Sequence, residues 1–172
     1  MRESLRLAIP DQNMLAEVAA YKKEMLESGS SLDGCGSLYR HTPEEWLENC
    51  RSISREETCP EGWAPATQYV CLRGDGCIVG MIDLRHRFNA FLAEIGGNIG
   101  YSVRPSERRK GYATRMLSMV LEETRAMGLT WVLVTCDADN EASWRTIERN
   151  GGVFERMTQD ESVAIRRYWI EL

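Results

Sequence analysis

The chain has 172 residues, of which 43% are hydrophobic and 27% charged, a composition typical of one globular domain that can bury its own core. Its formal net charge of -5 argues against a protein that binds nucleic acid or an anionic membrane surface, because both need a basic face. No stretch approaches the roughly 18 consecutive apolar residues that a membrane span requires, and the polar run after Pro10 does not resemble an export leader. We therefore expect a single cytoplasmic domain over residues 1–172.

The N-terminal third predicts one strand and two helices. Leu5 to Ile9 alternates loosely, as a strand does, and residues 11–27 carry apolar side chains at helical spacing. Ser28 to Gly36 is rich in serine and glycine and predicts a loop. Thr42-Pro43-Glu44-Glu45 is typical of a helix start, with proline in the first turn and acids near the positive end of the helix dipole. That helix should run to about Ile53.

The middle of the chain predicts three strands. Gln68 to Arg73 and Cys77 to Leu84 flank Gly74-Asp75-Gly76, which indicates a hairpin. A further strand is predicted over Ile95 to Val103, and Pro105 stops it.

The C-terminal part alternates helix and strand. An apolar stripe predicts a helix over Gly111 to Met127, and Thr130 to Cys136 is continuously apolar, as a strand covered on both faces should be. Asn140 is a natural cap for a short helix that Asn150-Gly151-Gly152 ends. Two last strands, Val153–Met157 and Ala164–Ile170, complete the order β-α-α-β-β-β-α-β-α-β-β. This order predicts a mixed α/β (α+β) domain around one sheet of seven strands with four helices.

The six cysteines give no sign of a metal site. They include no C-x-x-C pair, and the chain has only two histidines, so we expect buried thiols in a reducing compartment and neither a metal nor a disulfide. The six are Cys35, Cys50, Cys59, Cys71, Cys77 and Cys136.

A basic cluster lies at the start of the helix that begins at Gly111. The window from Arg104 to Arg115 holds five basic residues and one acid, so its local charge is +4 while the rest of the chain sums to -9. Free backbone N–H groups and the helix dipole favour an anion at such a place, and Gly111 lets the backbone approach a bulky one. A diphosphate fits this description. The alternative is a solvated basic turn in which the glycine serves only the backbone.

This window also resembles a known family. Ile99 to Pro105, followed by Arg108-x-x-Gly111-x-Ala113, is similar to the acyl-CoA signature of the GNAT N-acetyltransferase superfamily, Q/R-x-x-G-x-G/A after a strand and at the start of a long helix. Asn140-Glu141-Ala142-Ser143 and Asn150 to Phe154 resemble the strand-helix-strand element that follows. The resemblance covers nearly the whole chain and implies a mostly antiparallel sheet that splays between its fourth and fifth strands.

The resemblance implies a site for acetyl-CoA as cosubstrate, with no metal. The diphosphate would be held by the backbone N–H groups of Arg109, Lys110, Gly111, Tyr112, Ala113 and Thr114. Arg108 and Lys110 would add positive charge. Tyr101 and Val103 would face the pantetheine arm, with Asn140 and Ser143 on its other side, although Asn140 could equally be a plain helix cap.

The resemblance further implies direct attack of an amine on the thioester. The backbone amide of Val103 would donate to the oxyanion. Glu94 is the first candidate for the general base, with Asp83 and His86 behind it, and each could instead be a solvated charge. Many relatives carry a tyrosine seven residues after the position of Asn140, as the acid for the departing thiolate. This chain has Ile147 there, so the general acid stays unassigned.

The acceptor site would be built by residues 28–41, the hairpin and residues 160–167, with Phe88 to Leu92 as an apolar flap or an ordinary packed loop. A primary amine is expected, a small molecule in preference to a protein, and a homodimer is an open alternative. Two competing functions are an acyl-CoA-binding or sensing domain that has lost catalysis, and a protein-interaction domain whose basic turn contacts an acidic partner.

Overall fold

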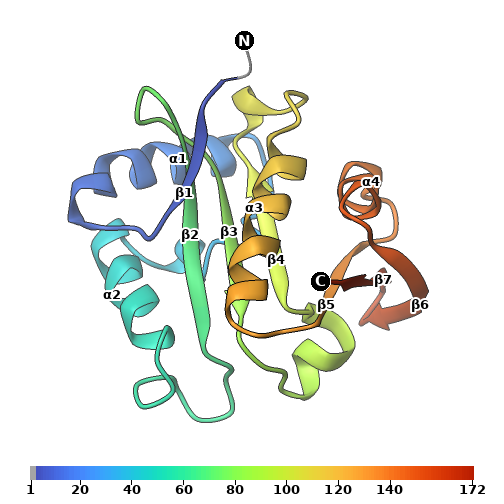
Figure 1. Ribbon diagram of the computed structural model, residues 1–172. Helices are drawn as coiled ribbons and strands as arrows, with labels where there is room; N and C mark the ends of the chain where they lie inside the picture. Colours follow the sequence, from blue (N-terminus) through green and yellow to red (C-terminus); the bar gives the residue numbers. More distant parts are fainter. Residues whose placement is uncertain (1–2) are drawn as a thin grey trace.

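The computed structural model, which describes residues 3–172, is built around one seven-stranded sheet (Figure 1). The strands are β1 (Leu5–Ala8), β2 (Ala66–Arg73), β3 (Ile78–Arg85), β4 (Ile99–Val103), β5 (Trp131–Asp137), β6 (Val153–Asp160) and β7 (Val163–Glu171). The α-helices are α1 (Leu15–Glu27), α2 (Pro43–Ile53), α3 (Tyr112–Ala126) and α4 (Glu141–Arg149). Short helical turns occur at η1 (Gln12–Met14), η2 (Leu38–Arg40), η3 (Leu92–Gly96) and η4 (Pro105–Glu107). The predicted fold class and order of elements are confirmed.

The sheet opens between β4 and β5. Its strand order is β1-β2-β3-β4-β5-β7-β6, and β4 and β5 form its parallel pair while the other neighbours are antiparallel. The β4–β5 ladder consists of the single pair Ile99 and Val134. Beyond that pair the two strands diverge, and in Figure 1 β5, β7, β6 and α4 stand to one side of β4 and α3. The predicted splay between the fourth and fifth strands is therefore confirmed.

The register of β4 decides where its backbone amides point. The amide of Arg85 donates to Asn98 O at 2.7 Å, and the amide of Arg104 donates to Val79 O at 2.9 Å. In an antiparallel ladder the bonded pairs alternate, so the N–H groups of Tyr101 and Val103 point away from β3. They point toward the side of β5, where the sheet has opened.

Two apolar cores lie on opposite faces of the sheet. On one face α1 and α2 bury the large side chains of Tyr21 and Trp46 against β2 and β3. On the other face α3 buries the stripe that includes Leu117 and Val120. The predicted start of α2 is confirmed in detail, because Thr42 and Glu45 form a reciprocal capping box.

One predicted strand is shorter than the sequence indicated. The stretch predicted as strand from Ile95 begins with the end of the π-helix η3, and β4 starts only at Ile99. Gly97 turns the chain with a φ of 66°, and a β-carbon there would lie 2.6 Å from Leu133 O. Arg85 stabilises this turn, since its Nη1 donates to Gly96 O at 2.8 Å. A tertiary contact therefore overrides the local strand pattern.

Three further observations concern residues 3–172. None of the helices in this range is long and apolar enough to cross a membrane. Nowhere in the same range do three or more His, Cys, Asp or Glu side chains gather in positions that could hold a metal ion. All six cysteines are free thiols.

Candidate active site

The start of α3 presents a row of unpaired amides. Arg109 and Gly111 both have positive φ angles, 67° and 78°, so the chain enters the helix through a tight turn, and no side chain caps it. The backbone N–H groups from Arg109 to Thr114 donate to no acceptor within residues 3–172, and the first amide bonded there is that of Arg115, to Gly111 O at 3.3 Å. Six successive free donors at a helix N-terminus are suited to an anion with several oxygens.

The positive charge near this turn is smaller than the sequence count suggests. Arg104 is buried and directed into the protein, where it pairs with Glu24 at 2.9 Å and Glu17 at 3.4 Å. Lys110 Nζ lies 2.8 Å from Glu107, which also pairs with Arg73. The nearby cationic side chains hold the pKa of Glu107 below its usual value.

Two basic side chains at the turn lie at the surface. Arg109 is exposed, and Arg108 folds back so that its Nε donates to Val103 O at 3.0 Å and its Nη2 to Ser30 Oγ at 2.8 Å. The phenol of Tyr112 is buried and bonds to Glu3, which leaves only the backbone of Tyr112 for a ligand. Ala113 and Thr114 are half-buried at the first turn of α3.

Side chains from β4 and α4 meet across the opened sheet. The Tyr101 hydroxyl lies 2.8 Å from Ser143 Oγ and donates to Ser143 O at 3.1 Å. Burial raises the pKa of Tyr101 well above its usual value. The side chain of Asn140 accepts from the amide of Ser143 at 3.1 Å, so it caps α4. The structure thus brings Tyr101, Val103 and Ser143 to the same opening, with Asn140 at its α4 side.

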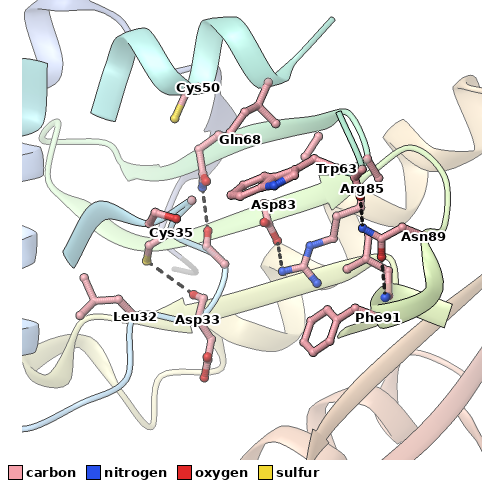
Figure 2. Close-up of a pocket in the computed structure, with 18 residues that line it drawn as sticks. Leu32, Asp33, Cys35, Cys50, Trp63, Gln68, Asp83, Arg85, Asn89 and Phe91 are labelled. Atoms are coloured by element: carbon pink, nitrogen blue, oxygen red, sulfur yellow. Dashed lines mark hydrogen bonds and ion pairs between the residues drawn. The ribbon is translucent and has the colours of Figure 1, made fainter. Parts of the chain in front are cut away.

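A cavity of about 540 Å³ lies on the face of the sheet that α1 and α2 cover (Figure 2). Its walls come from the α1–α2 loop, α2, the α2–β2 loop, strands β2 and β3, and the segment that ends in η3. The lining residues are Leu32, Asp33, Gly34, Cys35, Gly36, Ser37, Cys50, Ile53, Gly62, Trp63, Ala64, Ala66, Gln68, Asp83, Arg85, Asn89, Phe91 and Leu92. Of the segments predicted for the acceptor site, residues 28–41 and the β2–β3 hairpin line this cavity, whereas residues 160–167 do not.

The polar group nearest β4 in this cavity is Asp83. Its Oδ1 accepts from the amide of Gly100 at 3.0 Å and lies 3.2 Å from Arg85 Nη2. Its Oδ2 accepts no hydrogen bond from residues 3–172, and it is not among the buried atoms that lack a partner. One carboxylate oxygen is therefore free for a ligand.

The α1–α2 loop is pressed directly onto β4. Gly34 has a φ of 68°, and a β-carbon there would lie 2.2 Å from Gly100 O. Gln68 holds the loop from β2, because its Nε2 donates to Gly34 O at 2.7 Å. Only a glycine fits this close approach, which places the cavity wall against the strand that carries Tyr101 and Val103.

The three candidate bases have different surroundings. Glu94 does not line the cavity; it pairs with Arg156 at 2.7 Å and accepts from Thr158, and these contacts lower its pKa to about 2. His86 bonds to Thr67, and burial lowers its pKa. Only Asp83 of the three lies on the cavity wall. Glu94 thus lies outside the cavity with its carboxylate paired to Arg156, whereas Asp83 faces the cavity.

Several features of the site were missed from the sequence. Trp63 and Phe91 flank the Asp83–Arg85 pair in Figure 2, and they are 51% and 56% exposed. Trp63 lies in an irregular segment without periodicity, so no local signal in the sequence indicated it. Phe91 lies within the segment Phe88 to Leu92, for which the sequence indicated an apolar flap or a packed loop. Ile147 is fully buried in the core.

Comparison with known proteins identifies the family. The model of the acetyltransferase (GNAT) domain family matches residues 15–153, which is most of the chain. The chain therefore belongs to the GNAT acetyltransferase family. Acetyltransferases of this family use acetyl-CoA, and the free amides at α3 and the open sheet fit the anionic and extended parts of that molecule. A comparison with curated proteins found no match.

Solved structures show the same fold at low identity. A ribosomal alpha-N-protein acetyltransferase in complex with coenzyme A has a TM-score of 0.73 and 16% identity, over 98% of this chain and 94% of that one. An acetyl transferase of Salmonella typhimurium that modifies the N-terminal serine of a 50S ribosomal subunit protein has a TM-score of 0.71 and 15% identity, over 98% and 95%. A spermidine N-acetyltransferase chimera from Vibrio cholerae and hSSAT has a TM-score of 0.67 and 15% identity, over 97% and 95%.

Proposed function

We propose that this protein transfers an acetyl group from acetyl-CoA to a primary amine by direct attack. The observation that carries the proposal is the row of six unpaired amides from Arg109 to Thr114, beside a sheet that opens between β4 and β5. The diphosphate of acetyl-CoA binds at these amides, and the exposed guanidinium of Arg109 adds charge. The pantetheine arm then lies in the opening, next to Tyr101 on β4 and Ser143 on α4.

The backbone of Val103 is suited to stabilise the transition state. Its N–H points into the opening and away from β3, as the register of β4 requires. A preorganised donor of this kind contributes about 3–4 kcal/mol to catalysis in enzymes that use one. In the reaction the amine nitrogen forms a bond to the thioester carbon, the carbon–sulfur bond breaks, the nitrogen loses a proton, and the CoA thiolate takes one up.

The amine must lose a proton before it attacks. For a lysine-like amine with a pKa of about 10.4, the neutral form costs roughly 4.6 kcal/mol at pH 7. Burial of the amine lowers its pKa and reduces that cost. Asp83 attracts the cationic amine to the cavity, although its charge favours the protonated amine and opposes the effect of burial. It lies against β4 through its bond to Gly100. Asp83 therefore replaces Glu94 as the carboxylate that we place beside the amine.

A small molecule is the proposed acceptor. The structures that this chain resembles include a spermidine N-acetyltransferase and enzymes that act on ribosomal proteins, so the fold serves both kinds of acceptor. The cavity of about 540 Å³ is walled by three loops and two strands and has the size of a small-molecule site. Six free cysteines fit the reducing cytoplasm, where we place the reaction.

Titration with acetyl-CoA, followed by assay of CoA release with a panel of amines, tests the proposal. Binding together with turnover is the expected result. A ligand at 100 times its Kd should stabilise the protein by about 2.7 kcal/mol in a thermal shift measurement. Tight binding without turnover for any amine would instead favour the sensing domain, for which the buried Ile147 is the supporting observation. Absence of binding would refute both functions.

A further inference from the structure

The cavity beside β4 has a composition that selects among amines. Its ionisable side chains at neutral pH are Asp33, Asp83 and Arg85, which leave one net negative charge. The two thiols on its wall, Cys35 and Cys50, are uncharged, because burial raises the pKa of each to about 12. One excess negative charge matches one ammonium group, whereas a polyamine would need several carboxylates.

The one cation in the wall is already engaged. Arg85 Nη1 donates to Gly96 O at 2.8 Å, and its Nη2 faces Asp83 at 3.2 Å. Its Nη1 fastens the π-helix to β3, and its Nη2 partly neutralises Asp83 on β3 itself. A ligand carboxylate would therefore meet Asp83 and Asp33, and the one guanidinium of the wall already faces Asp83.

Two amide side chains of the wall donate to the backbone of the protein. Gln68 Nε2 donates to Gly34 O at 2.7 Å, and Asn89 Nδ2 donates to Gly62 O at 3.0 Å, while its Oδ1 accepts from Leu92. The second oxygen of Asp83 is a free acceptor, and so is one oxygen of Asp33, whose other oxygen accepts from Ser31 at 2.7 Å. Of these two, Asp83 lies against β4 through its bond to Gly100, so its free oxygen is the acceptor beside that strand.

The outer end of the cavity is apolar and uncovered. Trp63 and Phe91 lie on either side of the Asp83–Arg85 pair and are more than half exposed (Figure 2). Leu32 and Ile53 are further apolar residues of the cavity wall. Aromatic side chains gain from the burial of their faces against an apolar body, and they also attract a cation.

We propose that the acceptor is a primary amine with a single positive charge on an aromatic or bulky apolar skeleton, bound with its ammonium at Asp83 and its skeleton between Trp63 and Phe91. This inference rests on the proposed function and names its substrate class. It excludes polyamines, free amino acids and short alkylamines as preferred acceptors.

Calorimetric titration of amines into the CoA-saturated protein tests this without the need for turnover. The probes are 2-phenylethylamine, phenylalanine, which adds only a carboxylate, ethylamine, which lacks the ring, and spermidine, which adds charge. Binding of 2-phenylethylamine should be at least about tenfold tighter than that of each of the other three, a ratio expected when one apolar or ionic contact is lost. Equal or tighter binding of spermidine, phenylalanine or ethylamine would overturn the inference.

Two variants test where the amine binds. Trp63→Ala and Asp83→Asn should each weaken 2-phenylethylamine by about tenfold, as loss of an aromatic face or of a charge-assisted hydrogen bond predicts, and leave CoA affinity unchanged. Trp131→Ala is the matched control, because Trp131 is 48% exposed and lies outside the cavity. Unchanged amine affinity in both cavity variants would contradict the inference alone. A protein that binds no CoA would instead contradict the proposed function. In that case the amines would be titrated into the CoA-free protein, and the same order of affinities would still test the inference.

Discussion

The carboxylate of Asp83 on β3 accepts a hydrogen bond from the backbone amide of Gly100 on β4, at 3.0 Å. This bond joins the cavity on the α1–α2 face of the sheet to the strand that borders the opening. One oxygen of Asp83 faces the cavity, and Gly100 lies next to Tyr101, whose amide points into the opening between β4 and β5. An amine held at Asp83 is therefore bound against the strand that is proposed to carry the thioester.

The fit of the α1–α2 loop onto β4 can be tested with two glycines of the same conformation. Gly34 and Gly29 have φ angles of 68° and 66°, but a β-carbon at Gly34 would lie 2.2 Å from Gly100 O, whereas nothing lies within 4 Å at Gly29. Gly29→Ala should cost about 1 kcal/mol of stability through backbone strain alone. Gly34→Ala should cost more than about 3 kcal/mol, because overpacking is added. Equal denaturation midpoints for the two variants would show that the loop does not press on β4.

Glu94 offers a test that separates a structural role from a catalytic one. Glu94→Gln should keep turnover within about twofold, because a carboxylate with a pKa of about 2 is a weak base. The variant should be less stable at neutral pH, since it loses the ionised partner of Arg156.

The loss of stability in Glu94→Gln should depend on pH in a defined direction. The folded-state pKa of Glu94, about 2, lies below the usual 4.5, so its contribution to stability is present above pH 4.5 and disappears as the pH falls toward 2. Urea denaturation of both proteins across this range measures the difference. A large fall in kcat with unchanged stability would restore Glu94 as the base.

The contact between Tyr101 and Ser143 should hold α4 against β4. Tyr101→Phe removes this hydrogen bond and should lower the free energy of unfolding by about 1 kcal/mol. Tyr39→Phe is the matched control, because Tyr39 is exposed and its hydroxyl makes no hydrogen bond to residues 3–172. Burial raises the pKa of Tyr101 well above 10. A plot of the wild-type rate against pH should therefore show no change from its ionisation below pH 10. Equal stability of the two variants would contradict this role.

The sequence predicted most of the fold because its signals are local. The apolar stripe of the third helix and the Thr42–Glu45 cap each lie within one element, and both are confirmed. The failure at Ile95 has a tertiary cause, since Arg85 and Gly97 impose a π-helix on residues that would otherwise suit a strand.

The candidate site was likewise predicted where its signal is local and missed where it is not. The helix-start turn at Gly111 is a contiguous motif, so the sequence could indicate an anion site there. The cavity joins Gly34, Trp63 and Asp83 from three distant segments, and its wall depends on a glycine contact that no local pattern reveals. The charge count around Gly111 was too high for a similar reason, because Arg104 turns inward to Glu17 and Glu24.

The two ends of α3 provide a matched pair for the diphosphate site. Gly111 precedes the helix and Gly128 follows it, with φ angles of 78° and 82°, and a β-carbon added at either position would meet no atom within 4 Å. Valine should strain both positions by a similar amount, about 1–2 kcal/mol, and thermal denaturation checks that the strain is equal. Gly111→Val should weaken acetyl-CoA by more than about tenfold, as loss of amide contacts to a charged group predicts. Gly128→Val should leave the affinity unchanged. Similar affinities for the two variants would argue against a diphosphate at Gly111.

A crystal structure with bound coenzyme A tests the account most directly. We expect the diphosphate oxygens within hydrogen-bonding distance of the amides between Arg109 and Thr114, and the pantetheine arm between β4 and β5. Coenzyme A bound elsewhere on the protein, with those amides facing only solvent, would contradict it.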